Sequence, residues 1–388
     1  MRYPPLLQHA FRVCFLFAAL WAAAAVPIWL LIYAGTLAFD PGYGGINWHA
    51  HELMFGYAAL VVCGFLFTAI PNWTGRLPVA GWPLAALVAI WIAGRAAMLL
   101  PQVPGPALTA AIDIAFLAAV LAVAGREIVA GKNWRNLRVL AIVAWLLAAN
   151  IAFHGLILSG AAADISLRGA IGALIALITL VGGRLAPSFT RNWLVKQGAA
   201  ALPAPFGPPD AVAIGCSVLG LLAWIAIPDG AVTGALALVA ALALTWRLAR
   251  WRGWLTWREP LLPILHLGYG FVPLGFALLA GTTLWPAMIP ASAAVHAWTA
   301  GAIGTMTLAV MTRASLGHTG HALTATPGTV AIYLAILLAA VLRIAAAFSG
   351  DWRMALLDGA GTAWMAAFLL FAINYGPMLC TPRKPKGR

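Results

Sequence analysis

The chain has 388 residues, of which 63% are hydrophobic and only 9% are charged. Soluble domains are about 25% charged, because charge covers the surface that faces water. The composition therefore excludes an ordinary soluble enzyme and favours an all-α integral membrane protein. The net charge is +13, but the basic residues lie in short loops between apolar runs. This pattern predicts membrane topology and no nucleic-acid partner.

Apolar runs follow one another along the whole chain. A membrane-spanning helix needs about 20 mostly apolar residues. Twelve runs fit, at 12–34, 51–70, 82–100, 106–124, 138–158, 168–188, 211–227, 231–248, 260–280, 288–312, 327–348 and 355–375. We therefore predict twelve transmembrane helices that form a single domain over 1–388 in a lipid bilayer. The segment 189–210 holds four prolines and is predicted to be a cytoplasmic linker.

The basic residues predict the orientation of the chain. With twelve spans, one face receives both termini and the even-numbered loops. This face collects 19 of the 23 Lys and Arg residues, Arg12 and Arg247 among them. Cytoplasmic loops carry an excess of Lys and Arg, so both termini are predicted to be cytoplasmic.

Four ionisable residues within the spans match in predicted depth. Arg95 on span 3 matches Asp113 on span 4, and Arg343 on span 11 matches Asp358 on span 12. Charges at membrane depth tend to be paired or functional. Two interpretations stay open. Either the residues form buried ion pairs that fix helix register, or the arginines bind cofactor carboxylates or take part in a proton route.

The eight histidines make metal or haem binding a candidate function, because imidazole is the common protein ligand of haem iron and suits copper. His49 and His51 begin span 2, and His154 lies near the end of span 5. Residues two apart on a helix point about 200° away from each other. His51 is therefore the better buried ligand, and His49 the better ligand at the mouth of the span. No CxxCH motif occurs, so the sequence predicts non-covalent haem only.

Three further histidines are candidate ligands. His296 in span 10 is followed by small residues at 297, 300, 301 and 304, which leave one side of the helix flat for a planar macrocycle or for a neighbouring helix. His266 lies near the inner face. His318 precedes His321 by three residues at the cytoplasmic exit of span 10, where the pair would clamp a metal or lie in a solvated loop.

The chain contains an internal similarity. From His51, residues Gly, Ala and Thr-Gly follow at offsets 5, 18 and 23 to 24, and the same offsets hold from His296. A weaker copy on span 6 relates Pro187-Ser-Phe-Thr190 to Pro71-Asn-Trp-Thr74. Spans 2, 6 and 10 are four apart. We therefore predict three pseudo-repeated four-helix arcs, at about 12–124, 138–248 and 260–375.

Four long stretches, in order along the chain, resemble the NnrS family of bacterial membrane proteins. They are His49-Ala-His-Glu-Leu-Met-Phe-Gly-Tyr57, Gly64-Phe-Leu-Phe-Thr-Ala-Ile-Pro-Asn-Trp-Thr-Gly-Arg76, Gly182-Gly-Arg-Leu-Ala-Pro-Ser-Phe-Thr-Arg-Asn-Trp193, and His296-Ala-Trp-Thr-Ala-Gly-Ala-Ile-Gly-Thr-Met306 running on to Gly320. His321 departs from the pattern, which has Arg after Thr-Gly.

The resemblance implies a protein of the bacterial inner (cytoplasmic) membrane that contains haem and copper. The family is linked to denitrification, nitric oxide and nitrosative stress. Carried onto this chain, the resemblance places metal binding on His49, His51, His266, His296 and His318.

The predicted architecture is also similar to the catalytic subunits of haem–copper oxidases and nitric oxide reductases. There, histidines on the second and tenth helices hold a low-spin haem, and His51 and His296 occupy those helices here. Trp298 stands where a second histidine of helix ten is expected, and spans 6 and 7 have no histidine. We therefore expect no standard binuclear oxygen-reducing site.

Two functions remain in competition. The first is a membrane protein with a b-type haem held by His51 and His296 near the periplasmic side, which binds or redox-processes nitric oxide with an unknown electron donor. Its further cofactor-binding candidates are His154, His266, Arg95 and Arg343, and no catalytic residue is assigned. The second is a secondary transporter with intramembrane ion pairs, because twelve helices with internal repeats are also a transporter pattern.

Overall fold

Twelve long helices make up most of the computed structural model, which describes residues 3–38 and 42–384. Each is long and apolar enough to cross a membrane, and the described ranges contain no strand. Helices suit lipid because they satisfy every backbone polar group within one segment. The predicted twelve spans are confirmed, and the chain is a multi-pass membrane protein of a lipid bilayer.

The observed spans follow the predicted ones closely. Three of them are interrupted helices: α2 (Gly45–His51) with α3 (Ala59–Thr74), α7 (Asp164–Leu177) with α8 (Gly183–Lys196), and α12 (Ala291–His296) with α13 (Gly304–Thr319). The other nine are α1 (Ala10–Tyr33), α4 (Trp82–Leu99), α5 (Pro106–Ala130), α6 (Leu137–Leu158), α9 (Pro208–Ala226), α10 (Ala231–Ala249), α11 (Pro263–Leu284), α14 (Pro327–Phe348) and α15 (Arg353–Cys380).

The predicted linker at 189–210 is too long. α8 continues to Lys196 and α9 begins at Pro208, so only 197–207 connects the two helices. The difference has a physical reason. Arg191, Asn192 and Lys196 end the apolar run, but these side chains are compatible with a helix that extends beyond the hydrocarbon.

The interruptions are π-helical segments, at Glu52–Ala58, Ile178–Gly182 and Ala297–Ile303. They lie in spans 2, 6 and 10, the three spans related by the predicted repeat. In spans 2 and 10 the segment has seven residues and begins directly after the matching histidine, His51 or His296. In span 6 the π-helical segment does not begin at the position that corresponds to Glu52 or Ala297 in the repeat. Helices related by a sequence repeat would share an interruption of this kind. The division of the chain into three arcs stays a prediction.

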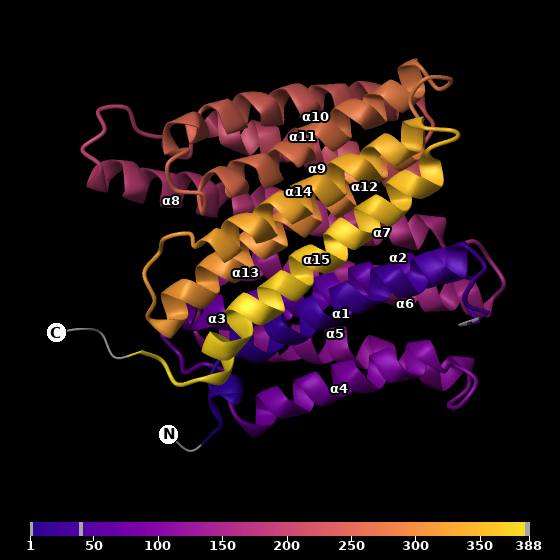
Figure 1. Ribbon diagram of the computed structural model, residues 1–388, viewed down its shortest axis with the longest axis horizontal. Helices are drawn as coiled ribbons and strands as arrows, with labels where there is room; N and C mark the ends of the chain where they lie inside the picture. The colour runs from indigo at the N-terminus through magenta and orange to yellow at the C-terminus, as the bar shows by residue number, and fades with distance from the viewer. Residues whose placement is uncertain (1–2, 39–41, 385–388) are drawn as a thin grey trace. The chain divides into compact units, whose positions relative to one another are not determined.

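The chain is divided into two compact units. Unit 1 comprises 1–173, 314–322 and 368–388, and unit 2 comprises 174–313 and 323–367. In Figure 1 most of unit 1 is indigo to magenta, and the parts of α13 and α15 that belong to it are orange and yellow. The single domain over 1–388 was predicted from the apolar runs alone and stays a prediction.

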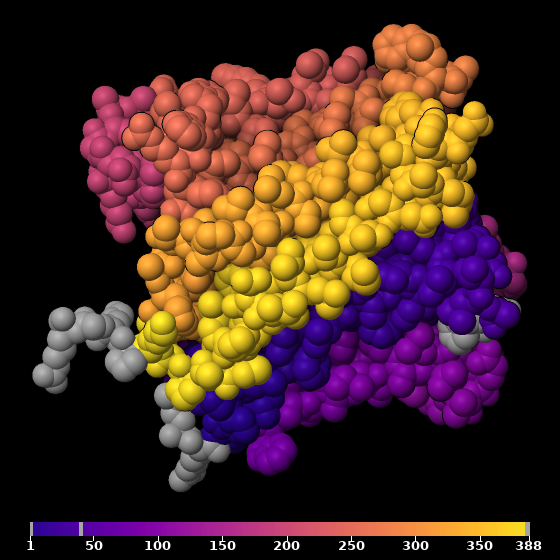
Figure 2. Space-filling view, viewed as in Figure 1, coloured from indigo at the N-terminus to yellow at the C-terminus, as the bar shows by residue number. Residues whose placement is uncertain are grey.

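Unit 1 joins the first helix to the end of the last one. The Arg12 guanidinium on α1 is 1% exposed and donates to the backbone carbonyls of Met378, Leu379 and Thr381 at 3.2, 2.8 and 2.6 Å. These carbonyls lie at the C-terminus of α15, where a helix has carbonyls without intrahelical partners and favours a cation. Figure 2 shows this end of α15 directly beside α1. Arg12 therefore does not lie in a solvated loop.

Unit 2 contains a second buried arginine, on α10. Arg247 is 1% exposed, and its Nε is 3.0 Å from Asp210 Oδ1 on α9. Its Nη1 donates to the carbonyl of Thr179 in the π-helical segment and to the hydroxyl of Tyr269 on α11 at 2.9 and 2.8 Å. Arg247 was expected at the membrane surface. The structure instead uses it to connect four spans.

Candidate metal centre

His51 lies where the second span changes from α-helix to π-helix. α2 ends at His51, and the π-helical segment begins at Glu52. π-helical turns occur frequently at functional sites. Both side chains are fully buried, at 0% exposure. Two consecutive polar side chains therefore enter the interior of unit 1 from the same turn.

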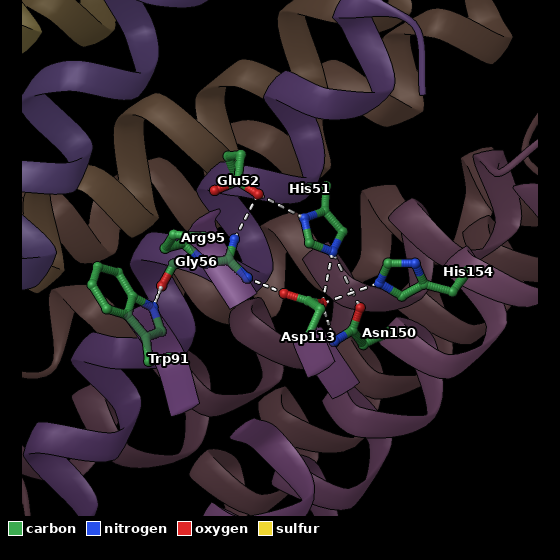
Figure 3. A network of polar contacts seen from close by, with 8 residues as sticks. All are labelled: His51, Glu52, Gly56, Trp91, Arg95, Asp113, Asn150 and His154. Atoms are coloured by element: carbon green, nitrogen blue, oxygen red, sulfur yellow. Dashed lines mark hydrogen bonds and ion pairs between the residues drawn. The ribbon is translucent and has the colours of Figure 1, made fainter. Parts of the chain in front are cut away.

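Three other spans bring polar side chains to His51, as Figure 3 shows. Asp113 from α5 is at the centre of the group. Its Oδ2 lies 3.0 Å from His51 Nε2 and 3.1 Å from His154 Nε2. The same oxygen accepts a 2.9 Å hydrogen bond from Asn150 Nδ2, and Oδ1 accepts one from Arg95 Nη2. One carboxylate thus connects α4, α5, α6 and the second span.

Arg95 holds the two acidic side chains together. Its Nη1 donates to Glu52 Oε1 at 2.6 Å, and that oxygen also accepts from His51 Nδ1 at 3.1 Å. The predicted pairing of Arg95 with Asp113 is confirmed. Gly56 makes room for the guanidinium, because a Cβ there would lie 2.7 Å from Arg95 Nη1. Both ion-pair partners of Arg95 are therefore carboxylates of the protein itself, Glu52 and Asp113.

The protein atoms do not satisfy every buried polar group in this network. Within residues 3–38 and 42–384, His154 Nδ1, Glu52 Oε2 and Arg95 Nε have no hydrogen-bond partner. Nearly all buried polar groups in native proteins are paired, with protein or with an ordered water or ion. The network therefore retains hydrogen-bonding or ligating capacity for a species other than the protein.

Three of these side chains have the geometry of metal ligands. One ligand atom each of His51, Asp113 and His154 lies within 4.8 Å of the other two, and all three residues are buried. Two imidazoles and one carboxylate form a ligand set that transition metals accept. The outer partners match those of metal centres, in which hydrogen bonds orient the ligands. Asn150 and Arg95 hold Asp113, and Glu52 holds the second ring nitrogen of His51.

Tyr43 covers the centre from the segment before α2. Its ring lies edge-on to the His154 ring at 5.9 Å and is stacked on Phe153 at 6.0 Å. Burial, together with the negative charges of Asp113 and Glu52, raises the pKa of Tyr43 to about 12. The hydroxyl therefore stays protonated at neutral pH and is available as a donor.

Comparison with known proteins identifies the family. The family model described as NnrS protein matches residues 5–383. The chain belongs to the NnrS family. The match includes all twelve spans and confirms the resemblance found in the four sequence stretches. No individually curated protein matches the chain. Membership of the NnrS family fits a membrane protein of the nitric oxide response.

Two predicted ligands of this NnrS protein lie apart from the His51 group, although they belong to unit 1. The His49 ring is stacked on Trp29 at 4.1 Å, on a different side of the helix from His51, as their spacing predicts. The His318 ring lies 5.4 Å from that of Phe11. Neither histidine belongs to the group of three ligand atoms.

The remaining two predicted ligands lie in unit 2. His296 Nδ1 donates to the carbonyl of Ser292 at 2.7 Å. In a neutral ring this hydrogen bond places the lone pair on Nε2, the arrangement that metal-ligating histidines commonly have. His266 Nε2 lies 2.8 Å from Thr190 Oγ1.

The small residues after His296 face aromatic side chains of unit 2. A Cβ at Gly301 would lie 2.5 Å from the Phe271 ring, and one at Gly304 would lie 2.6 Å from the Trp364 ring. The flat side of this helix was expected to face either a planar macrocycle or a neighbouring helix. At Gly301 and Gly304 the structure shows neighbouring helices. The pairing of Arg343 with Asp358 stays a prediction.

Sequence reasoning missed three residues in and around the candidate centre, Glu52, Asn150 and Tyr43. It singled out Asp113 as an ion-pair partner and not as a ligand. Asn150 carried a usable signal, because an amide within an apolar span needs a partner. Glu52 carried another, because it adjoins His51 in the sequence. Tyr43 lies outside the spans and carried none.

Proposed function

We propose that this NnrS protein holds a metal ion at His51, Asp113 and His154 and binds or redox-processes nitric oxide there, in the inner membrane of a bacterium. One observation supports the proposal most. Two imidazoles and one carboxylate from three spans of unit 1 converge at ligating distance in a fully buried place. A buried carboxylate, guanidinium and amide surround them, and this arrangement is costly unless it serves a bound charge or a function.

Copper is the metal that we propose first, since imidazole suits it and the family resemblance implies it. Two histidines and one carboxylate are also the ligands of non-haem Fe(II) sites. When bound, such a metal supplies a redox couple and an open coordination position for a small ligand. The chain supplies the ligand atoms His51 Nε2, His154 Nε2 and Asp113 Oδ2. Tyr43 limits access of water, and electrons come from an unknown donor.

His51 does not fit a haem iron in this arrangement. Its Nε2 faces Asp113 Oδ2 at 3.0 Å and Asn150 Oδ1 at 3.3 Å, and these side chains occupy the space that a macrocycle needs. We therefore derive no haem chemistry at His51. The proposal of a non-covalent b-type haem near the periplasmic side is supported by the Nδ1 hydrogen bond of His296, with Arg343 as a further candidate.

Metal analysis of the full-length protein in detergent tests the centre. The wild type should contain about one equivalent of copper or iron in addition to haem iron, and nitric oxide should change the electron paramagnetic resonance spectrum of that metal. Asp113→Asn and His154→Gln should lose the metal. His321→Gln is the matched control, because His321 lies outside the centre, and it should retain the metal.

Two further results discriminate between the proposals. A reduced-minus-oxidised spectrum with a pyridine haemochrome assay, with and without His296→Ala, tests the haem separately from the metal. Full metal content in folded Asp113→Asn and His154→Gln would refute the centre. A folded wild type that binds neither metal nor haem would favour the alternative, a secondary transporter with intramembrane ion pairs, which transport assays in vesicles would then examine.

A further inference from the structure

Each unit has a pocket at the end of its helices where arginine side chains gather. In unit 2 a cavity of about 810 Å³ lies between residues 202–205 and the end of α10, and Arg250 and Arg252 line it. In unit 1 a cavity of about 480 Å³ lies between residues 75–80 and the end of α5, and Arg76 and Arg126 line it. We propose that both pockets bind the phosphate headgroup of an anionic phospholipid. The proposal does not depend on the metal centre.

The two pockets occupy corresponding places in the chain. The unit 1 pocket is formed by the loop after span 2 and the end of span 4. The unit 2 pocket is formed by the loop after span 6 and the end of span 8. Spans 2 and 4 correspond to spans 6 and 8 when the chain is divided into groups of four. The same kind of pocket thus occurs twice at matching positions.

In both units an arginine that lines the pocket shares its carboxylate partner with a second arginine. In unit 1, Arg76 Nε and Arg126 Nη2 lie 2.5 and 2.8 Å from the two oxygens of Glu127. The two guanidinium groups of the unit 1 pocket are therefore only half neutralised by Glu127, and one positive charge remains for a ligand. Arginine binds phosphate oxygens through paired N–H groups.

In unit 2 only one arginine of such a pair, Arg250, lines the pocket, because Arg247 is buried, and Arg252 lines the pocket as a second arginine. Arg247 Nε and Arg250 Nη1 both lie 3.0 Å from oxygens of Asp210. Arg252 is exposed and forms no ion pair or hydrogen bond through its side chain within the described ranges. Its φ of 55° is in the left-handed region, which a non-glycine residue adopts at a cost.

Aromatic side chains distinguish a lipid from a free phosphate at the unit 2 pocket. Trp246 and Trp254 line it and are 49% and 63% exposed. Tryptophan gathers where the membrane meets water, with its ring at headgroup level. A phospholipid matches this pattern, because its phosphate reaches the arginines while its glycerol and upper acyl chains contact the rings. Basic pockets at the ends of transmembrane helices bind anionic lipids in this way.

Native mass spectrometry of the full-length protein in a neutral detergent, titrated with phosphatidylglycerol or with phosphatidylcholine of the same acyl chains, tests the proposal. The wild type should retain two phosphatidylglycerol molecules more tightly than phosphatidylcholine. Arg252→Gln and Arg126→Gln should each weaken one of the two binding events about fivefold, the contribution expected of one basic residue near a membrane surface.

The matched control is Lys196→Gln, which removes one exposed positive charge at the end of α8 without touching a pocket. It should bind both lipids as the wild type does. Arg76→Gln serves as a second unit 1 variant, and the melting temperature without lipid confirms that each variant is folded. Unchanged phosphatidylglycerol binding in folded Arg252→Gln and Arg126→Gln would overturn the proposal. Displacement of the lipid by millimolar glycerol phosphate would also overturn it and reassign both pockets to a soluble phosphate.

Discussion

Replacement of Arg95 by methionine removes the cation that two buried carboxylates share. Arg95 is 4% exposed, and its partners Glu52 and Asp113 are 0% and 2% exposed, so water cannot compensate the charge left behind. Removal of one partner from a buried ion pair costs about 3–5 kcal/mol. With an unfolding entropy of about 2.1 cal/mol/K per residue over a chain of 388 residues, the melting temperature should fall by roughly 4–6 °C.

The decisive comparison is with the double variant Glu52→Gln/Arg95→Met, followed by tryptophan fluorescence during heating in detergent. This variant removes one carboxylate together with the cation, so less uncompensated charge stays buried and the protein should melt above Arg95→Met. Arg258→Met is the control, because Arg258 is exposed and lies over the Trp257 ring, and it should melt as the wild type does. A double variant that is destabilised by the sum of its two single changes would refute the reasoning.

Two further predictions concern packing and pH. Gly275→Ala should lower the melting temperature by the equivalent of about 1–3 kcal/mol, because its Cβ would lie 2.3 Å from the Trp298 ring. Gly215→Ala, with nothing within 4 Å of its Cβ, should be neutral or stabilising by up to about 1 kcal/mol, and equal losses in the two variants would contradict the argument. Burial, and then the charge of Lys384, lowers the pKa of His321 below the ordinary 6.5. The unfolded chain therefore binds this proton first, and stability should fall as the pH drops below 6.5 toward the lower pKa of the folded state. Melting curves between about pH 7.5 and pH 5 should show a weaker pH dependence for His321→Gln, and an unchanged dependence would count against this assignment.

The sequence was sufficient to predict the spans because apolar length is a local property. α14 lies at 327–348 as predicted, and the other boundaries differ by a few residues. The largest differences occur where helices extend past the apolar run, as α8 does toward Lys196. Arg247 is a second case in which a basic residue lies elsewhere than the sequence predicted. A basic residue at the end of an apolar run was expected in a loop, but Asp210 on the neighbouring helix made its burial favourable.

The candidate metal centre was predictable only in part, because it depends on how the helices are rotated and on which of them are neighbours. Arg95 and Asp113 were paired correctly because they lie on consecutive spans at matching depth. His154 lies on α6, and nothing in the pattern of span 5 directs its ring toward Asp113. His51 was singled out as buried, but the neighbours that surround its ring come from α4, α5 and α6 and have no fixed spacing in the sequence.

The contact between Arg12 and the end of α15 has a consequence for biosynthesis. The carbonyls that Arg12 contacts belong to Met378, Leu379 and Thr381, and they do not exist when α1 leaves the ribosome. Arginines near the end of a transmembrane helix extend their charge to the interface, and Arg12, in the first turn of α1, is placed to do so while translation continues. Unit 1 is complete only when 314–322 and 368–388 have been synthesised. α1 is therefore among the last helices of unit 1 to find all of its partners.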